Sequence, residues 1–137
     1  MIPVNFLSVL IAAVVAFIIG FLMHGPVGGK MWMKLADIHP TGKEKFSDMY
    51  GQMFMNLVTF FVTSYVVAMF YAYASASGYA AAGVGTGIKV AVLAWLGFLV
   101  TTTATDVIWM GKKRGLWVYE AFSSLLVMIA IGAIIAW

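Results

Sequence analysis

The sequence contains no cysteine, and this absence removes several kinds of chemistry at once. Disulfide bonds, thiolate nucleophiles and thiolate metal sites are all excluded. The two histidines, His24 and His39, do not have the short helical spacing that paired histidine ligands use. The sequence also lacks a glycine-flanked nucleophilic serine and a glycine loop of the phosphate-binding type. We therefore expect no metal, no other cofactor and no catalysis.

Charge is the second shortage. Only 9% of the residues are charged and 64% are hydrophobic, so a monomer could not expose the surface of this chain to water. The formal net charge is +3, but the basic residues gather in two short loops and do not form a basic face interleaved with aromatic residues. This pattern argues against nucleic acid as a partner. The expected partner is the lipid bilayer, and the chain is predicted to be an integral membrane protein.

Long hydrophobic runs predict four transmembrane helices. They cover about residues 3–23, 49–74, 83–110 and 117–137. Each is long enough to cross a hydrocarbon core of roughly 30 Å, because an α-helix rises 1.5 Å per residue. The first run has no positively charged segment before it and is too long for the core of a signal peptide, so we interpret it as an uncleaved span. The predicted fold is all-α, a single domain in which four transmembrane helices form one compact bundle.

A short amphipathic segment follows the first span. Gly25 and Pro26 end that span, since proline has no backbone N–H and its ring clashes with the preceding turn. Residues 30–37 then combine methionine, tryptophan and leucine with lysines, a pattern typical of a helix that lies in the membrane interface. Tryptophan is enriched at membrane interfaces. Four tryptophans at the ends of the predicted helices are therefore expected to be interfacial anchors: Trp32, Trp109, Trp117 and Trp137.

The loop charges predict the orientation of the chain. Lys89 lies at the edge of the second loop, which is otherwise uncharged, whereas the first and third loops are basic. The basic residues of those two loops are Lys30, Lys34, Lys43, Lys45, Lys112, Lys113 and Arg114. Basic loops stay on the cytoplasmic side of a membrane. Both termini are therefore predicted to lie on the outer side.

Small residues recur every four positions in two of the predicted spans, which allows a neighbouring helix to approach closely. The predicted helix-packing positions are Ala12, Ala16 and Gly20 in the first span and Gly83, Gly87 and Ala91 in the third.

Polar residues gather near the predicted cytoplasmic level. In the second span Gln52, Asn56, Thr59 and Thr63 fall on one helical face, and that face is expected to look inward because amides are costly in lipid. The candidates for a polar cavity are His24, Gln52, Asn56, Asp106, Glu120 and Ser123. Lys112, Lys113 or Arg114 would neutralise the two acids.

Two interpretations of these acids remain open. Asp106 and Glu120 could lie at headgroup depth and tie the third loop. Alternatively, they belong to a cavity that is open to the cytoplasm and binds a small polar solute or relays a proton, with Glu120 as the titrating group.

Several motifs resemble a known family. They are Gly29-Lys-Met-Trp-Met-Lys34, Trp95-Leu-Gly-Phe-Leu-Val-Thr-Thr102 and a last span that ends in small residues and Trp137. Together they resemble the bacterial proteins classified as domain of unknown function 1761. The resemblance implies a four-span protein of the bacterial inner membrane and implies no activity. Glu120-Ala-Phe122 stands where the family usually has asparagine, a small residue and an aromatic residue.

Two functions are compatible with these patterns. The first is a structural or accessory subunit that packs with copies of itself or with a larger membrane complex. The alternative is a small homo-oligomeric transporter or channel with a polar cavity on the cytoplasmic side. A transport path needs polar groups through the full depth of the membrane, and only the second span, from Gln52 to Ser64, sustains them. This favours the accessory subunit.

Overall fold

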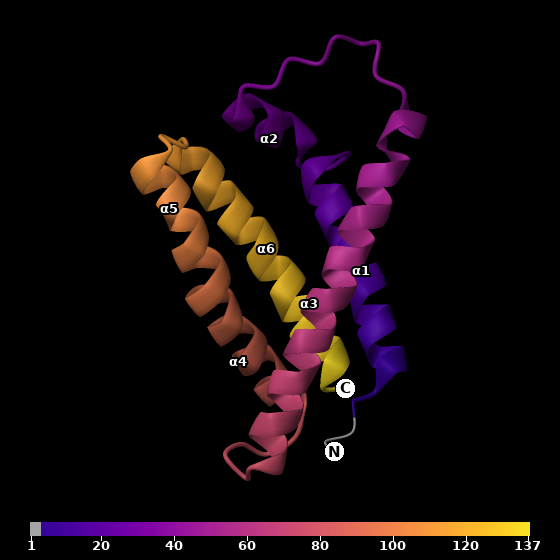
Figure 1. Ribbon diagram of the computed structural model, residues 1–137, viewed down its shortest axis with the longest axis vertical. Coiled ribbons are helices and arrows are strands. Elements are labelled where there is room, and N and C mark those ends of the chain that lie inside the picture. The colour runs from indigo at the N-terminus through magenta and orange to yellow at the C-terminus, as the bar shows by residue number, and fades with distance from the viewer. Residues whose placement is uncertain (1–3) are drawn as a thin grey trace.

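The structure is a computed structural model that describes residues 4–137, and over this range every regular element is a helix (Figure 1). Four helical segments are long and apolar enough to cross a membrane: Phe6–His24, Phe46–Ala76, Val84–Trp109 and Arg114–Ile135. The prediction of an all-α fold with four membrane-spanning helices is therefore confirmed.

The helices agree with the predicted spans except at some ends. Helix α1 covers Phe6–His24, and α2 (Gly29–Ala36) lies where the interfacial helix was expected. A 3₁₀ turn, Phe46–Met49, leads into α3 (Tyr50–Ala76). The third span consists of α4 (Val84–Ala94), the π-helical segment η2 (Trp95–Val100) and α5 (Thr101–Trp109). The last helix, α6, covers Arg114–Ile135 and so begins before the predicted residue 117. The predicted start of the first span, Pro3, lies outside the described residues.

Local sequence explains the ends of the first two helices. The side-chain oxygen of Asn5 accepts hydrogen bonds from the backbone N–H groups of Leu7 and Ser8, at 3.0 and 3.3 Å, and so caps the start of α1. Helix α1 ends at His24, and Gly25 caps it just before Pro26. Helix α2 ends at Ala36 and is capped by Asp37, which adopts a left-handed conformation with φ 61°.

The four spans run alternately up and down, so that all connections lie at two ends (Figure 1). One end, which we call the basic-loop end, contains α2 and residues 37–49 and 110–113. The opposite end, the terminal end, contains residues 77–83, the start of α1 and the end of α6 (Figure 1). The topology thus brings the two basic loops to the same end of the bundle.

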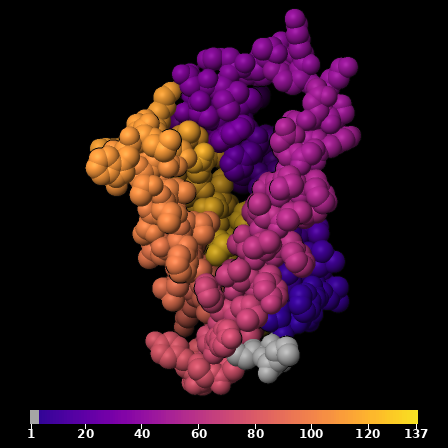
Figure 2. All heavy atoms as spheres, viewed as in Figure 1, coloured from indigo at the N-terminus to yellow at the C-terminus, as the bar shows by residue number. Residues whose placement is uncertain are grey.

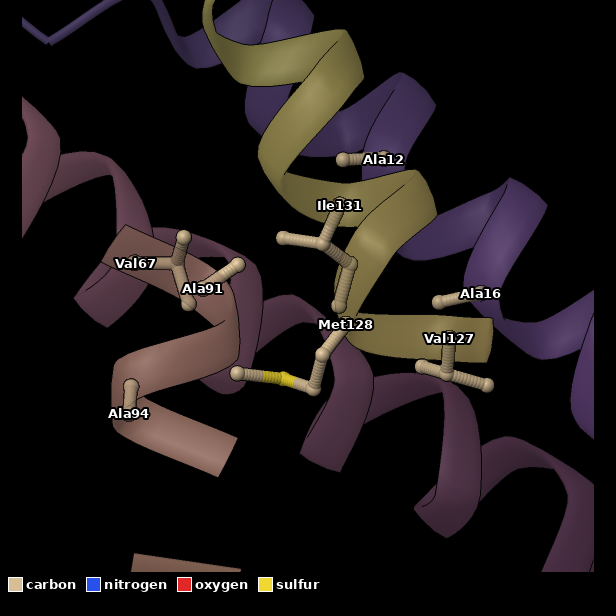
Figure 3. Packing of buried hydrophobic residues seen from close by; sticks show 8 residues of the cluster. All are labelled: Ala12, Ala16, Val67, Ala91, Ala94, Val127, Met128 and Ile131. Carbon is tan, nitrogen blue, oxygen red and sulfur yellow. The ribbon is translucent and has the colours of Figure 1, made fainter. Parts of the chain in front are cut away.

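Helix α6 is at the centre of the packing. It contacts α1, α3 and α4, and its side chains Val127, Met128 and Ile131 are buried. Figure 3 shows these residues between the alanines of α1 and those of α4. The alanines facing them are Ala12, Ala16, Ala91 and Ala94. Small side chains on the outer helices therefore accommodate the larger side chains of α6.

The closest helix contact lies between α4 and α6. A Cβ atom built on Gly87 would lie 2.2 Å from the carbonyl oxygen of Gly132, and one built on Gly132 would lie 2.4 Å from the oxygen of Gly87. Neither position can hold a larger residue without moving the backbone. At Gly20 the space is less restricted, because the nearest atom is a ring carbon of Phe60 at 3.3 Å.

Gly83 does not take part in helix packing, contrary to the prediction. A Cβ atom there would meet nothing within 4 Å among the described residues. Gly83 precedes α4 with φ 143°, a conformation that L-residues rarely adopt, and its N–H donates to the Tyr71 hydroxyl at 3.0 Å. A turn, not a helix contact, therefore requires glycine at this position.

Threonine hydroxyls accompany the π-helical segment. Thr101 donates to the carbonyl of Gly97 at 2.6 Å, and Thr103 donates to that of Leu99 at 2.7 Å. Threonine in a membrane helix commonly bonds the carbonyl one turn earlier and alters the local helical geometry. These hydroxyls are thus satisfied inside their own span, and π-helical turns of this kind are frequent near functional sites.

Candidate functional site

A cavity of about 600 Å³ opens in the half of the bundle nearer the basic-loop end. Helices α1, α3 and α6 form most of its walls, and Trp32 of α2 and Leu99 of η2 complete them. Figure 2 shows a hollow between α3 and the third span, with α6 visible at its floor. The volume is in the range of pockets that bind small organic molecules.

Five of the six predicted polar residues line this one cavity. They come from three helices: His24 from α1, Gln52 and Asn56 from α3, and Glu120 and Ser123 from α6. The remaining walls are mostly aromatic and aliphatic, for example Phe17, Phe21, Phe60, Val127 and Met128.

Asp106 is the predicted cavity residue that does not line the cavity. It lies near the end of α5, and its carboxylate oxygen is 3.8 Å from the ammonium of Lys112. Its backbone carbonyl accepts the N–H groups of Met110 and Lys112, which close the third loop. Asp106 therefore organises the loop between α5 and α6.

One lysine serves both acids. The Lys112 ammonium, on the loop between α5 and α6, forms an ion pair and hydrogen bond with Glu120 and also lies near Asp106. Lys113 pairs instead with Asp37 at the end of α2, at 3.6 Å, and both of these side chains are exposed. The single charged carboxylate of the cavity wall is thus already neutralised by a cation beside it.

Aromatic side chains connect α1, α2 and α6 at the basic-loop end. The His24 ring is 5.2 Å from the Trp32 ring and 6.2 Å from the Tyr119 ring, both edge to face. The Tyr119 hydroxyl donates to the carbonyl of Met23. A Cβ atom on Gly28 would lie 1.9 Å from this hydroxyl, so the α1–α2 corner requires glycine. These contacts fix α2 across the end of the cavity.

Hydrogen-bonding capacity remains free inside the cavity. Ser123 is only 3% exposed, and its hydroxyl has no partner among the described residues. The Nδ1 atom of His24 lies 3.0 Å from the carbonyl oxygen of Gly20, which places a proton on Nδ1 and leaves Nε2 as an acceptor in the neutral ring. An unpaired buried polar group is costly, so the Ser123 hydroxyl favours a polar partner, and the exposed His24 ring offers a further acceptor.

The amides of α3 face the cavity but stay accessible. Gln52 and Asn56 line it, yet both side chains are exposed because the cavity is open on one side. The Gln52 amide fits best with its nitrogen toward the carbonyls of Asp48 and Met49, at 3.1 and 3.2 Å. Thr59, expected on the same face, does not line the cavity and donates to the carbonyl of Asn56 at 2.7 Å.

The predicted tryptophan anchors occupy two kinds of position. Trp109 and Trp137 are 83% and 99% exposed at helix ends, as an interfacial anchor requires. Trp32 instead lines the cavity, and the Trp117 indole N–H donates to the Thr103 hydroxyl at 3.1 Å. Sequence reasoning missed the cavity role of Trp32, although its place on the apolar side of α2 could have indicated it.

A second, smaller cavity of about 430 Å³ lies toward the terminal end, lined by residues that include Asn5, Ser8, Tyr71 and Ser75. Between the two cavities lies the buried cluster of α1, α3 and α6, which contains Ala12, Ala16, Val67, Met128 and Ile131. Within the described residues, no group of three or more histidine, aspartate or glutamate side chains is placed to hold a metal ion.

The fold and the cavity define a small membrane protein with four spans and a binding-sized cavity at one end. A family model described as protein of unknown function (DUF1761) matches residues 7–136, and the chain therefore belongs to this family. No curated protein and no solved structure matches the chain.

Proposed function

We propose that this protein is a membrane-embedded binding protein that holds a small molecule in the cavity near its basic-loop end. The observation that carries the proposal is the cavity itself. It has a volume of about 600 Å³, mostly apolar walls and polar groups converging from three helices. Pockets with this composition are typical of small-molecule sites.

A purely structural role has less support than the sequence suggested. The small residues Ala12, Ala16, Gly87 and Ala91 are all buried inside the chain. They are therefore used in packing one copy of the protein and do not offer a seam to a second copy or another subunit. Packing of the chain with other proteins does not by itself account for the open cavity.

Native mass spectrometry on the protein extracted gently from its own membranes tests this proposal. We expect a bound small molecule that dissociates on activation. The variant Asn56→Phe places an apolar ring in the cavity at an exposed position, which limits the risk to folding, and should lose this molecule. Met55→Phe is the matched control, because Met55 lies next to it in α3 but is exposed and does not line the cavity.

Two outcomes would contradict the proposal. One is a wild-type protein that carries no small molecule, and the other is equal retention by both variants. A second protein chain present in stoichiometric amount would favour the accessory subunit, whose function would then depend on that partner.

A carrier is the second candidate, and the cavity toward the terminal end favours it. Two cavities toward opposite ends, separated by a cluster of buried side chains, are compatible with access that alternates between the two sides. A channel through a single chain has no such support, because buried apolar residues lie between the cavities. Flux of the co-purified molecule into sealed proteoliposomes, abolished by Asn56→Phe, would establish the carrier.

We propose that the basic-loop end faces the cytoplasm of a bacterial cell and that both termini lie outside the inner membrane. The basic residues of the first and third loops support this orientation. The chain has no cysteine, so single-cysteine variants report position directly. In intact cells an impermeant thiol reagent should label Ser77→Cys and should not label Lys43→Cys. The reverse pattern would contradict the orientation.

A further inference from the structure

We infer that the ligand of this cavity is an uncharged amphiphile, a hydrocarbon chain or ring system with a hydroxyl or carbonyl head, that enters sideways from the bilayer between α3 and the third span. The inference rests on the proposed binding function and specifies the chemical class of the ligand and its route.

The route follows from the way in which α3 diverges from the third span. Within residues 4–137 the backbone of α3 approaches that of α4 but not that of η2 or α5. The Phe70 and Phe98 rings stack at 6.4 Å and bridge α3 to η2. Beyond this pair, toward the basic-loop end, the hollow seen in Figure 2 remains open between the two spans. The opening thus lies in a side wall of the bundle.

The depth of the opening places it against lipid. The spanning segment of α3 begins at Phe46, and Asn56 lies ten residues further, roughly 15 Å along the helix. This is hydrocarbon depth in a membrane whose core is roughly 30 Å thick. A molecule dissolved in the bilayer can enter here without leaving the membrane.

The charges of the cavity favour an uncharged head. Glu120 is the one carboxylate among the described lining residues, and Lys112 already pairs with it. Lysine and arginine are absent from the same lining residues. An anionic head would therefore meet a carboxylate with no free cation, and a cationic head would compete with Lys112.

The remaining polar atoms suit a hydroxyl or a carbonyl. The buried Ser123 hydroxyl has no partner among the described residues, and the Asn56 side chain carries an amide and lines the same cavity. Both can donate to a ligand oxygen, and Nε2 of neutral His24 can accept from a ligand hydroxyl. Phe60, Val127 and the other apolar lining residues provide a surface for the hydrocarbon part.

Photolabelling can test both the route and the ligand class. Full-length protein in phosphatidylcholine vesicles is exposed to a long-chain fatty alcohol with a diazirine in mid-chain. A matched sample receives the fatty acid of equal length at a pH at which it is ionised. We expect the alcohol to label cavity residues such as Phe60, Val127 and Met128 at least about threefold more than the acid, because the ionised carboxylate would meet Glu120 with no free cation beside it.

The variant Ser123→Ala sharpens the test. Loss of one hydrogen-bond donor should reduce labelling of the cavity by the alcohol about three- to tenfold. Asn56→Ala, at an exposed position, gives a second reading if Ser123→Ala does not fold. Ser77→Ala is the control, because Ser77 lies at the terminal end and donates to the carbonyl of Ala74.

The outcomes separate this inference from the proposed function. Equal or stronger labelling of the cavity by the acid would overturn the inference about the ligand class. The proposed binding function would still stand if native mass spectrometry detected a bound small molecule. Labelling confined to outward residues such as Val62 would overturn the lateral route in the same way. Absence of both cavity labelling and a co-purified molecule would overturn both proposals.

Discussion

The two halves of this bundle are built from the same four spans but pack differently. Toward the terminal end, α4 and α6 approach until Gly87 and Gly132 are in backbone contact, and Ala12 and Ala91 are fully buried. Toward the basic-loop end, α3 separates from the third span and leaves a cavity of about 600 Å³. We call the first the closed half, because its α4–α6 contact is tight although the smaller cavity lies between α1 and α3. The second, with Phe60, Leu99 and the α3 amides, is the open half.

This difference indicates what holds a membrane bundle together. Lipid tails are as apolar as leucine, so helices gain little by burying large hydrophobic side chains against one another. Close contact requires small residues that allow the backbones to approach, as Gly87 and Gly132 do between α4 and α6. A half that cannot close can hold a ligand.

The largest expected effect concerns the closed half. Gly87→Ala should destabilise the fold by about 3 kcal/mol or more, because the new Cβ atom would lie 2.2 Å from the carbonyl oxygen of Gly132, a backbone atom that cannot move aside cheaply. Gly85→Ala, in open space on the same helix, should have no cost and could gain up to about 1 kcal/mol of helix propensity. Unfolding in mixed detergent micelles measures both. Equal effects would remove the distinction between the halves.

The second prediction concerns the charges of the open half. Lys112→Met removes the cation that faces both Asp106 and Glu120, and we expect a loss of about 1–2 kcal/mol, since these side chains are only partly buried. Adding Asp106→Asn and Glu120→Gln to this variant should restore most of the lost free energy of unfolding. The control, Lys113→Met, breaks an exposed pair with Asp37 and should cost less than about 0.5 kcal/mol. If Lys113→Met destabilised the protein more than Lys112→Met, the assignment of Lys112 as the partner of the two acids would be wrong.

Tyr119→Phe should have a smaller effect. It removes the hydroxyl that donates to the Met23 carbonyl at the α1–α2 corner, which is expected to cost about 1 kcal/mol. The same unfolding experiment applies, with Tyr79→Phe as the control because Tyr79 is exposed at the terminal end. If the two variants unfold alike, the hydroxyl does not hold the corner.

The smallest effect lies in the first loop, outside both halves. The backbone N–H and the hydroxyl of Thr41 donate to the Glu44 carboxylate, at 2.9 and 2.8 Å, and lower the pKa of Glu44 from 4.5 to about 2. Because the pKa is lower in the folded loop, the turn is fully stabilised above about pH 4.5 and loses this contribution as the pH falls through about 2. An NMR titration of the Glu44 carboxyl checks the value. Thr41→Ala should raise the pKa, and an unchanged value would contradict the assignment.

The sequence predicted most of the polar residues that line the cavity but not the aromatic and aliphatic residues of its walls. His24, Gln52, Asn56, Glu120 and Ser123 could be grouped because topology places the ends of neighbouring spans at one level. Asp106 was grouped with them for the same reason, but its carboxylate lies near Lys112 of the third loop. The depth of a residue along a helix does not determine which way the helix is rotated about its axis.

The packing positions show the same limit. Spacing every four residues correctly selected Ala12, Ala16, Gly87 and Ala91, which are buried. It also selected Gly83, which serves a turn, because glycine is required by backbone conformation as well as by close contact. The choice of Lys112 over Lys113 or Arg114 as the partner of Glu120 depended on the path of the loop.

By itself the sequence determined four membrane spans, an interfacial helix and two basic loops at one end, because hydrophobic length and loop charge are local properties of the chain. The tertiary structure alone decided that the closed half meets at Gly87 and Gly132, that α3 diverges from α5, and that the resulting cavity opens sideways. Those features depend on the tilt and rotation of each helix against its neighbours. Several contacts set these angles together, and no single segment encodes them.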